Sequence, residues 1–361
     1  MAAVVVLIFH AEAACDAGPL ERWVADARCH LADHHRAAFA AAGATGVRIV
    51  AGPPDDTPFG ARLRDFIEHE GPTGIVVLGS GSIPLATAAD RRAFVSAASG
   101  PGRVALTNNR FSADVVAVAE AAVLRDLPDL ATDNALPRWL DEVAGYPVRE
   151  RRPWRLGVDI DGALDLVLLG VDAGARGTRS RSRSFAPPPP DGIDLGRVQR
   201  AIAQVRAVAA DRGAELVVAG RTSAAVLAWL ERHQPARVRA LIEERGLRTS
   251  TLGQRRPSSI LGALLDRDGP GSLGMHLPTL GDAAILDSRV LLAHRLGADE
   301  RAWPSAEDRF ASDLLLHERI GDPWLRDLTK AAADAPIPIV LGGHTLVGPG
   351  LRLVLGVRGS V

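Results

Sequence analysis

Short apolar runs alternate with longer amphipathic stretches along the first half of the chain. Aliphatic, largely β-branched runs of this kind are typical of strands buried on both faces, as in a parallel sheet. The pattern predicts strands at 4–9, 47–50, 74–78, 103–107 and 156–160. It predicts helices at 20–42, 58–70, 88–98, 136–144 and from 161 to about 169. Strand and helix in alternation predict an α/β fold with a doubly wound parallel sheet.

Polar or small residues follow several of these predicted strands. They are His10, Gly79-Ser80-Gly81-Ser82, Asn108-Asn109 and the acids Asp159 and Asp161. Doubly wound sheets bind their ligands at the carboxyl ends of the strands, so we expect these residues to share one ligand site. The small residues at 79–82 suit a backbone that approaches a phosphate, or a plain turn between strand and helix.

The regular alternation breaks after about residue 172. An Arg/Ser tract at 179–184 and four prolines at 187–190 predict a linker over 173–194. A second, helix-rich α/β domain is predicted over 195–361. Its strands are expected at 215–219, 238–242, 337–341 and 351–357, and its helices at 195–212, 224–232, 258–265, 283–295 and 306–320.

Composition narrows the function classes. A chain of 361 residues predicts two domains. The net charge of −1 supplies no field that would attract nucleic acid or an anionic membrane. No signal peptide or apolar run of about 18 residues is visible, and Cys15 and Cys29 lack disulfide or zinc spacing. The missing signal peptide and membrane span predict a cytoplasmic location. Lys330 is the single lysine in an Ala- and Arg-rich chain, which indicates a GC-rich genome, and we expect a bacterial protein.

The segment Val158-Asp159-Ile160-Asp161-Gly162-Ala163-Leu164-Asp165-Leu166 carries two acids where a strand meets a helix. Acids there can hold a divalent cation against phosphates, and Asp161 can equally cap the helix. The segment resembles the D-x-D-T-P-x-D-L motif of GT-A-type nucleotidyltransferases, such as molybdenum cofactor or phospholactate guanylyltransferases. The loop at 78–85 resembles that family's x-x-D-x-P-L loop. The resemblance covers about residues 1–172.

That resemblance implies a nucleotide-binding domain of Rossmann-like GT-A fold with a nucleoside triphosphate as substrate. It implies Mg²⁺ or Mn²⁺ held by Asp161 and Asp159, with Arg110 as a third catalytic group that neutralises charge. Nucleotide and substrate would be bound by His10, Gly79, Ser80, Gly81, Ser82, Asn108 and Asn109.

Two departures from the family pattern bear on catalysis. The stretch 10–18 has neither the Arg nor the Lys that clamps the triphosphate in the family. Ser82 stands where the family places its first metal-binding Asp, and a hydroxyl is a poorer ligand for a hard cation than a carboxylate.

The second domain offers fewer candidates. Arg221, in Gly220-Arg221-Thr222-Ser223 between a predicted strand and helix, is expected to bind an anion. The clusters 243–245 and 287–289 are expected to be solvated faces or ion pairs. His344 lies in a loop that either reaches a cleft or is structural. His30, His34 and His35 are interpreted as a polar helix face.

Three hypotheses follow. The chain transfers a nucleotidyl group from a triphosphate to a small phosphorylated or carboxylated acceptor. Alternatively, it binds a nucleotide or phosphorylated metabolite without catalysis, or it is a GT-A-type glycosyltransferase that uses a nucleotide sugar. All three predict a small-molecule partner, no nucleic acid and no membrane, and they leave a homodimer open.

Overall fold

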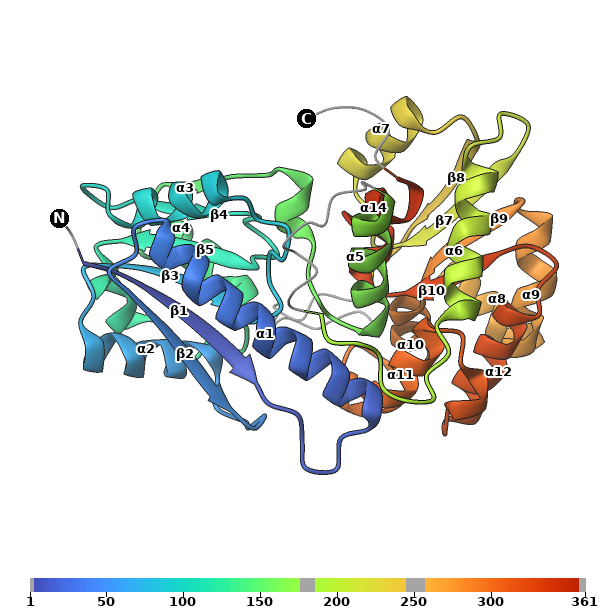
Figure 1. Ribbon diagram of the computed structural model, residues 1–361, viewed down its shortest axis with the longest axis horizontal. Helices are drawn as coiled ribbons and strands as arrows, with labels where there is room; N and C mark the ends of the chain where they lie inside the picture. Colours follow the sequence, from blue (N-terminus) through green and yellow to red (C-terminus); the bar gives the residue numbers. More distant parts are fainter. Residues whose placement is uncertain (1–2, 176–185, 245–256, 357–361) are drawn as a thin grey trace. The chain divides into compact units, whose positions relative to one another are not determined.

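The structure is a computed structural model that describes residues 3–175, 186–244 and 257–356. The chain divides into two compact units (Figure 1). The first, unit 1, comprises the described parts of 1–16, 25–160 and 184–187. The second, unit 2, comprises mainly the described parts of 17–24, 161–183 and 188–361. Each unit contains its own β-sheet, so each has its own core.

Unit 1 is built on a six-stranded sheet. Its strands lie in the order β2-β1-β3-β5-β4-β6. β1 pairs in parallel with β2 and β3, and β4 with β6, whereas β5 is antiparallel to both of its neighbours. The strands are β1 (Val4–Ala11), β2 (Gly46–Gly52), β3 (Gly74–Gly79), β4 (Ala105–Thr107), β5 (Val115–Ala119) and β6 (Val148–Glu150).

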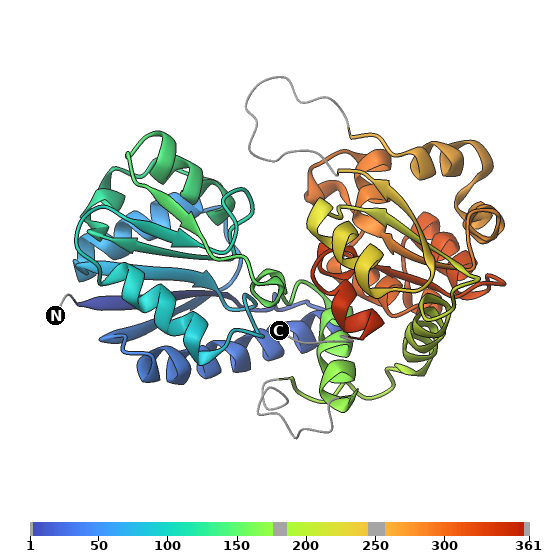
Figure 2. The same cartoon turned by 90° about the horizontal axis from the view of Figure 1, so that it is seen from above.

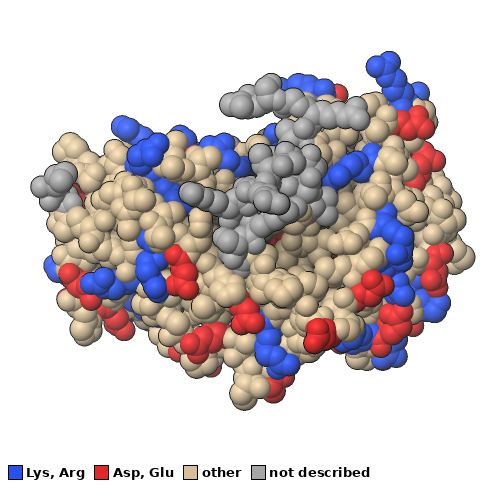
Figure 3. Space-filling model, viewed as in Figure 1, with Lys and Arg blue, Asp and Glu red and all other residues tan. Residues whose placement is uncertain are grey.

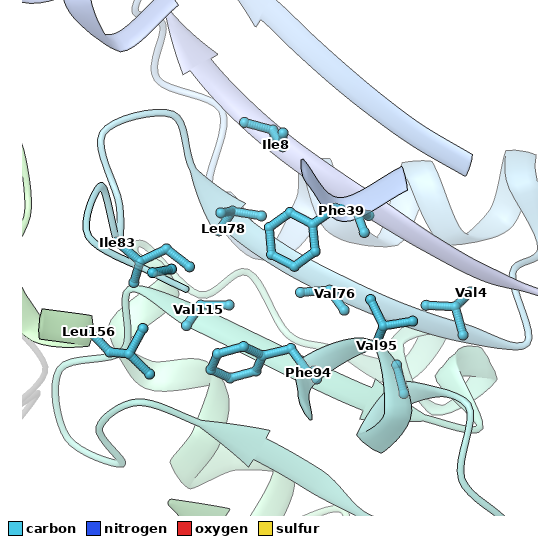
Figure 4. Packing of buried hydrophobic residues seen from close by; sticks show 14 of the residues in the cluster. Val4, Ile8, Phe39, Val76, Leu78, Ile83, Phe94, Val95, Val115 and Leu156 are labelled. Atoms are coloured by element: carbon cyan, nitrogen blue, oxygen red, sulfur yellow. The ribbon is translucent and has the colours of Figure 1, made fainter. Parts of the chain in front are cut away.

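Helices cover both faces of this sheet (Figure 2). Because successive side chains of a strand point to opposite faces, Val6 and Ile8 of β1 join one core cluster and Leu7 the other. Phe39 and Phe94 fill the first cluster from two helices on that face (Figure 4). The helices are α1 (Pro19–Ala41), α2 (Phe59–Glu70), α3 (Ala88–Ala98) and α4 (Leu136–Glu142). The predicted α/β fold class is confirmed.

Two predicted features of unit 1 need correction. β5 and β6 are not among the predicted strands, although all five residues of β5 are buried. The strand predicted at 156–160 is instead a 3-10 turn, Trp154–Gly157, followed by extended chain. This chain makes one isolated antiparallel bridge, between Ser82 and Asp159, so its apolar residues are buried without belonging to the sheet.

Unit 2 contains a four-stranded, wholly parallel sheet in the order β10-β9-β7-β8. The strands are β7 (Glu215–Gly220), β8 (Arg237–Ile242), β9 (Ala283–Asp287) and β10 (Ile339–Gly342). The helices are α5 (Ala163–Ala175), α6 (Gly196–Ala209), α7 (Ala224–His233), α8 (Ile260–Asp268), α9 (Leu273–His276), α10 (Ser288–Leu296), α11 (Ala306–Asp313), α12 (Pro323–Ala333), α13 (His344–Val347) and α14 (Leu351–Leu355).

The helix predicted at 283–295 is two elements. Its first five residues form the fully buried strand β9, and α10 begins at Ser288. The side chain of Asp287 marks the junction because it accepts a hydrogen bond from the N–H of Arg289, as an N-cap does. The strand predicted at 351–357 is also wrong, since residues 351–355 form α14.

The boundary between the units falls at residue 160, not at 172 as predicted. α5 packs against α11 and α14 of unit 2, because its buried Leu164 and Leu168 need an apolar partner. The predicted boundary therefore lies inside α5. The Arg/Ser tract at 179–184 lies outside the described residues.

The structure also bears on the charge distribution, the cysteines and the possibility of a membrane-spanning helix. On the face drawn in Figure 3, basic and acidic side chains lie interspersed over much of the surface. Cys15 and Cys29 are free thiols, and both side chains are exposed. Within the described part of the chain, no helix is both long and apolar enough to span a bilayer.

Candidate functional site

The topology of unit 1 singles out the space beyond the carboxyl ends of β1 and β3. β2 lies on one side of β1 and β3 on the other, so the chain reverses its winding direction between β1 and β3. Ligands of open α/β sheets bind outside the carboxyl ends of the strands at such a switch point. The residues that follow β1 and β3 are therefore the first candidates for binding.

His10 and Ser80 meet at this switch point. Nδ1 of His10, near the end of β1, lies 3.0 Å from Oγ of Ser80, directly after β3. Both side chains are buried. Burial and then the charge of Arg28 lower the pKa of His10, so its ring is neutral at pH 7. The structure thus brings together two predicted residues as a neutral pair of hydrogen-bonding groups.

The loop at 79–82 is joined to the chain at 159–160. Ser82 forms the isolated β-bridge with Asp159, and the N–H of Ile160 donates to the carbonyl oxygen of Gly81 at 3.0 Å. A Cβ on Gly81 would lie 3.2 Å from Oδ1 of Asp159 and 2.9 Å from the carbonyl oxygen of Ile160. Gly81 is therefore required by this close approach of two chain segments, and Asp159 lies beside the loop. A Cβ on Gly79 would lie 3.2 Å from Oγ of Ser82.

A buried hydrogen-bond network of His35 and Arg91, which the sequence did not predict, supports the loop at 79–82. His35 Nε2 lies 2.8 Å from the carbonyl oxygen of Ser82, and Nη2 of Arg91 lies 3.3 Å from His35 Nδ1. Arg91 also donates to the carbonyl oxygen of Ala86 at 2.7 Å. Burial and then the charge of Arg91 lower the pKa of His35 to about 3. The interpretation of His35 as part of a polar helix face is wrong, because its side chain is fully buried.

A second anchor fixes the chain just before Asp159. The carboxylate of Asp90 accepts hydrogen bonds from Arg155 and Arg151 at 2.8–2.9 Å and caps α3 through Thr87. Burial opposes ionisation of Asp90, but the hydrogen bonds from Arg155, Thr87 and Arg151 outweigh it and hold its pKa below the ordinary value. Asp90 therefore ties the start of α3 to the segment that leads into 156–160.

Asn108 and Asn109 make their hydrogen bonds within the fold. The amide of Asn108 donates to the carbonyl oxygen of Leu156 at 2.8 Å and to Asp114 at 2.6 Å. Its oxygen accepts from the N–H of Asp114 at 2.9 Å. The oxygen of Asn109 accepts from the N–H groups of residues 111 and 112. Asn108 thus also anchors the segment that carries Asp159, and its predicted role in binding substrate remains a prediction.

Arg110, the predicted catalytic cation, is paired with Asp141. Its backbone N–H donates to Oε1 of Glu150 at 2.8 Å. The exposed fraction of the Arg110 side chain is 32%, so solvent reaches the guanidinium. The structure supplies a structural role for Arg110 and leaves its catalytic role a prediction.

Asp161, the other predicted metal ligand, is grouped with unit 2. Its backbone N–H and that of Gly162 each donate to Oδ2 of Asp165 at 2.8 Å. Asp165 therefore stabilises the first turn of α5 from inside the helix, a role open to acids near a helix N-terminus. Burial and then the charge of Asp161 raise the pKa of Asp165 to about 8.

The predicted metal site depends on Asp159 and Asp161. Among the described residues, no group of three or more His, Cys, Asp or Glu side chains is placed to hold a metal ion. The side chains present therefore do not fit a hard divalent cation, which prefers several carboxylate or carbonyl oxygens. The predicted Mg²⁺ or Mn²⁺ stays a prediction.

Unit 2 has a polar cluster of its own, of which only Arg221 is among the predicted site residues. Arg221 follows β7 and donates to Asp287 at the end of β9, with N–O distances of 2.5 and 3.0 Å. Arg289 donates to Asp313 of α11, with Nη2 2.6 Å from Oδ2. The expectation of an ion pair at 287–289 is met, but these pairs are buried, not solvated. Nδ1 of His344 lies 3.1 Å from the carbonyl oxygen of Arg221.

Comparison with known proteins gives a weak likeness. No family model and no curated protein sequence matches the chain. A crystal structure of a "putative nucleotide-diphospho-sugar transferase" from Desulfovibrio desulfuricans G20 resembles it with a TM-score of 0.38 and 15% sequence identity. The match covers 51% of this chain and 94% of the other. A likeness at this level decides nothing about what this chain binds.

Proposed function

We propose that unit 1 binds a nucleotide, or a metabolite that contains one, at the carboxyl ends of β1 and β3. The observation that carries the proposal is the meeting of His10 and Ser80 at the switch point, 3.0 Å apart. A neutral imidazole and a hydroxyl can hydrogen-bond to a base, a ribose or a phosphate oxygen. The neighbouring loop 79–82 consists of Gly and Ser alone, which allows close approach to a backbone.

We favour binding over metal-dependent catalysis as the function of this site. Ser82 lacks the carboxylate that the GT-A resemblance would require, and the stretch 10–18 has neither an Arg nor a Lys to clamp a triphosphate. Loop 79–82 is nevertheless rigidly supported by the His35–Arg91 pair behind it. A supported loop without its catalytic charges suits a protein that retains ligand recognition.

Group transfer is the second candidate. The observation in its favour is the position of Asp159, which is bridged to Ser82 and so lies beside the proposed ligand. In that case the chain transfers a nucleotidyl group from a triphosphate to a small phosphorylated or carboxylated acceptor, or a sugar from a nucleotide sugar.

Isothermal titration calorimetry separates the two candidates. The full-length protein is titrated with each of the four nucleoside triphosphates and with UDP-glucose, first in EDTA and then in Mg²⁺. Binding without a role in metal chemistry predicts an affinity that is retained in EDTA. Group transfer predicts an affinity that appears only when Mg²⁺ is present.

The variant Ser80→Ala tests where the nucleotide binds. Loss of one neutral hydrogen bond is expected to weaken binding by about three- to tenfold. Ser96→Ala is the matched control, because Ser96 is exposed on α3 and its loss leaves the affinity unchanged. If no nucleotide binds, or if Ser80→Ala and Ser96→Ala bind equally well, the proposal is wrong.

A further inference from the structure

The sheet of unit 2 has a switch point of its own. β8 lies on one side of β7 and β9 on the other, so the winding direction reverses between β7 and β9. The residues at the carboxyl ends of these strands are Arg221 and Thr222 after β7 and Asp287 at the end of β9. His344 follows β10, the next strand along. The topology therefore marks this edge as a place for a ligand, independently of unit 1.

The charges at this edge largely cancel. Arg221 is paired with Asp287, and Arg289 with Asp313. The side chains of these four residues are at most 12% exposed. Arg309 also acts on Asp313, whereas Asp161 and Asp165 add acidic groups that act on members of the cluster. The cluster thus has no surplus positive charge for a phosphate, and the described residues offer no site for a metal ion.

Among the described residues at this edge, two neutral polar groups can bind a ligand after the charged side chains are paired. Thr222 is 6% exposed, and its Oγ1 has no hydrogen-bond partner among the described residues. Native proteins rarely leave a buried hydroxyl unsatisfied, because it loses its hydrogen bonds to water and gains none in return. The Thr222 hydroxyl is therefore suited to form a hydrogen bond with a bound ligand.

The second neutral group is Nε2 of His344. Its Nδ1 is hydrogen-bonded to the carbonyl oxygen of Arg221 at 3.1 Å. A carbonyl oxygen can only accept, so Nδ1 carries the proton, and in the neutral ring Nε2 has a free lone pair. Burial and then the charge of Arg221 lower the pKa of His344, which keeps the ring neutral at pH 7. Nε2 is therefore a fixed hydrogen-bond acceptor.

We propose that this edge of unit 2 is a second ligand site, which binds the hydroxyl groups of a neutral polyhydroxylated molecule such as a free sugar or a cyclitol. A ligand hydroxyl can donate to Nε2 of His344 and another can satisfy Oγ1 of Thr222. The paired guanidinium and carboxylate groups hold the ends of β7, β9 and α11 in place around them.

NMR titration of the full-length protein tests this site. D-glucose, N-acetylglucosamine and myo-inositol are added separately at millimolar concentration, and the imidazole ¹⁵N resonances of His344 are followed. The expected result is a saturable shift of Nε2 with at least one of these probes. Thr222→Val, which keeps the shape of the side chain, is expected to weaken that binding by about three- to tenfold.

Thr329→Val is the matched control in the same unit. The Thr329 hydroxyl is also buried but is hydrogen-bonded to Ser312 and to the carbonyl oxygen of Leu325, both at 2.7 Å. This variant is expected to lose stability and to keep its affinity for the ligand. His344→Asn retains a donor toward Arg221 but lacks Nε2, so it is expected to bind as weakly as Thr222→Val, provided that its circular dichroism matches the wild type.

Three results would overturn the proposal. The first is the absence of a saturable shift with any of the three probes. The second is equal weakening by Thr222→Val and Thr329→Val. The third is a response to inorganic phosphate alone that disappears in Thr222→Val, which would identify an anion site instead. Nucleotide binding by unit 1 is expected to be unchanged in Thr222→Val, so failure here is distinguishable from failure of the proposed function.

Discussion

The carboxylate of Asp90 offers a sharp test of how unit 1 holds its candidate site. Its side chain is fully buried, whereas its partners Arg151 and Arg155 are 36% and 29% exposed. Asp90→Asn keeps the size of the side chain and an oxygen that can still accept a hydrogen bond from Thr87. It removes the charge that faces two guanidinium groups.

Breaking a buried ion pair typically costs about 3–5 kcal/mol. The partial exposure of both arginines lowers this cost because water takes over part of their solvation. We therefore expect Asp90→Asn to lower the free energy of unfolding of unit 1 by roughly 2–4 kcal/mol at pH 7. Urea denaturation followed by circular dichroism measures this value, with hydrogen exchange used to assign the transition to unit 1.

The effect is expected to depend on pH in one direction. The pKa of Asp90 is lower in the folded protein than its ordinary value of 3.8. Its stabilising contribution is therefore present in full above the unfolded pKa and is lost as the pH falls below about 4. The difference between wild type and Asp90→Asn is expected to persist from pH 8 to pH 5 and to shrink toward pH 3.

Asp129→Asn is the matched control for Asp90→Asn. Asp129 also pairs with an arginine, Arg64, at 2.6 Å, but its side chain is 63% exposed. We expect this variant to lie within about 0.5 kcal/mol of the wild type. If the two substitutions cost the same, or if the difference does not shrink in acid, the assignment of Asp90 as a charged anchor is refuted.

Three further predictions concern single side chains. Thr222→Val is expected to be neutral or to raise the free energy of unfolding by up to about 1 kcal/mol, because it removes an unsatisfied hydroxyl. Thr329→Val is expected to lower the free energy of unfolding by roughly 1–3 kcal/mol. Thermal denaturation of both variants measures these changes in stability. Because the pKa of His35 is about 3 in the fold and 6.5 outside it, its NMR resonances should not titrate between pH 8 and 5, and its contribution to stability falls as the pH drops below 6.5. Gly220→Ala is expected to cost roughly 2–4 kcal/mol in urea, since Gly220 has φ +128° and a Cβ there would lie 2.2 Å from Cβ of Asp287.

Most of the sheet of unit 1 is predictable because its main strands carry a clear hydrophobic pattern. β1 and β3 contain continuous runs of Val, Ile and Leu. Such runs are typical of a strand that is buried on both faces. β9 escaped prediction because its first two residues are alanine, which favours helices, and because α10 follows it directly. Only its pairing with β7 and β10 makes it a strand.

Some residues of the candidate sites were predictable from the sequence and others were not. His10 and Ser80 were predictable from their positions after two parallel strands, since the carboxyl ends of such strands lie at one edge. The ion-pair partners of the buried charges were not predictable, because the two members of each pair are far apart in the sequence. Asp287 and Arg221 are 66 residues apart, and Asp313 lies 24 residues beyond Arg289. Local spacing showed charged clusters but carried no signal that they would be buried against one another.

The central claim, that a nucleotide binds where β1 and β3 end, is tested most directly by hydrogen–deuterium exchange with and without the nucleotide that binds best. The account predicts slower exchange in peptides that cover residues 9–12 and 79–84, with unit 2 unchanged. Protection confined to residues 215–356, or none anywhere, would contradict it.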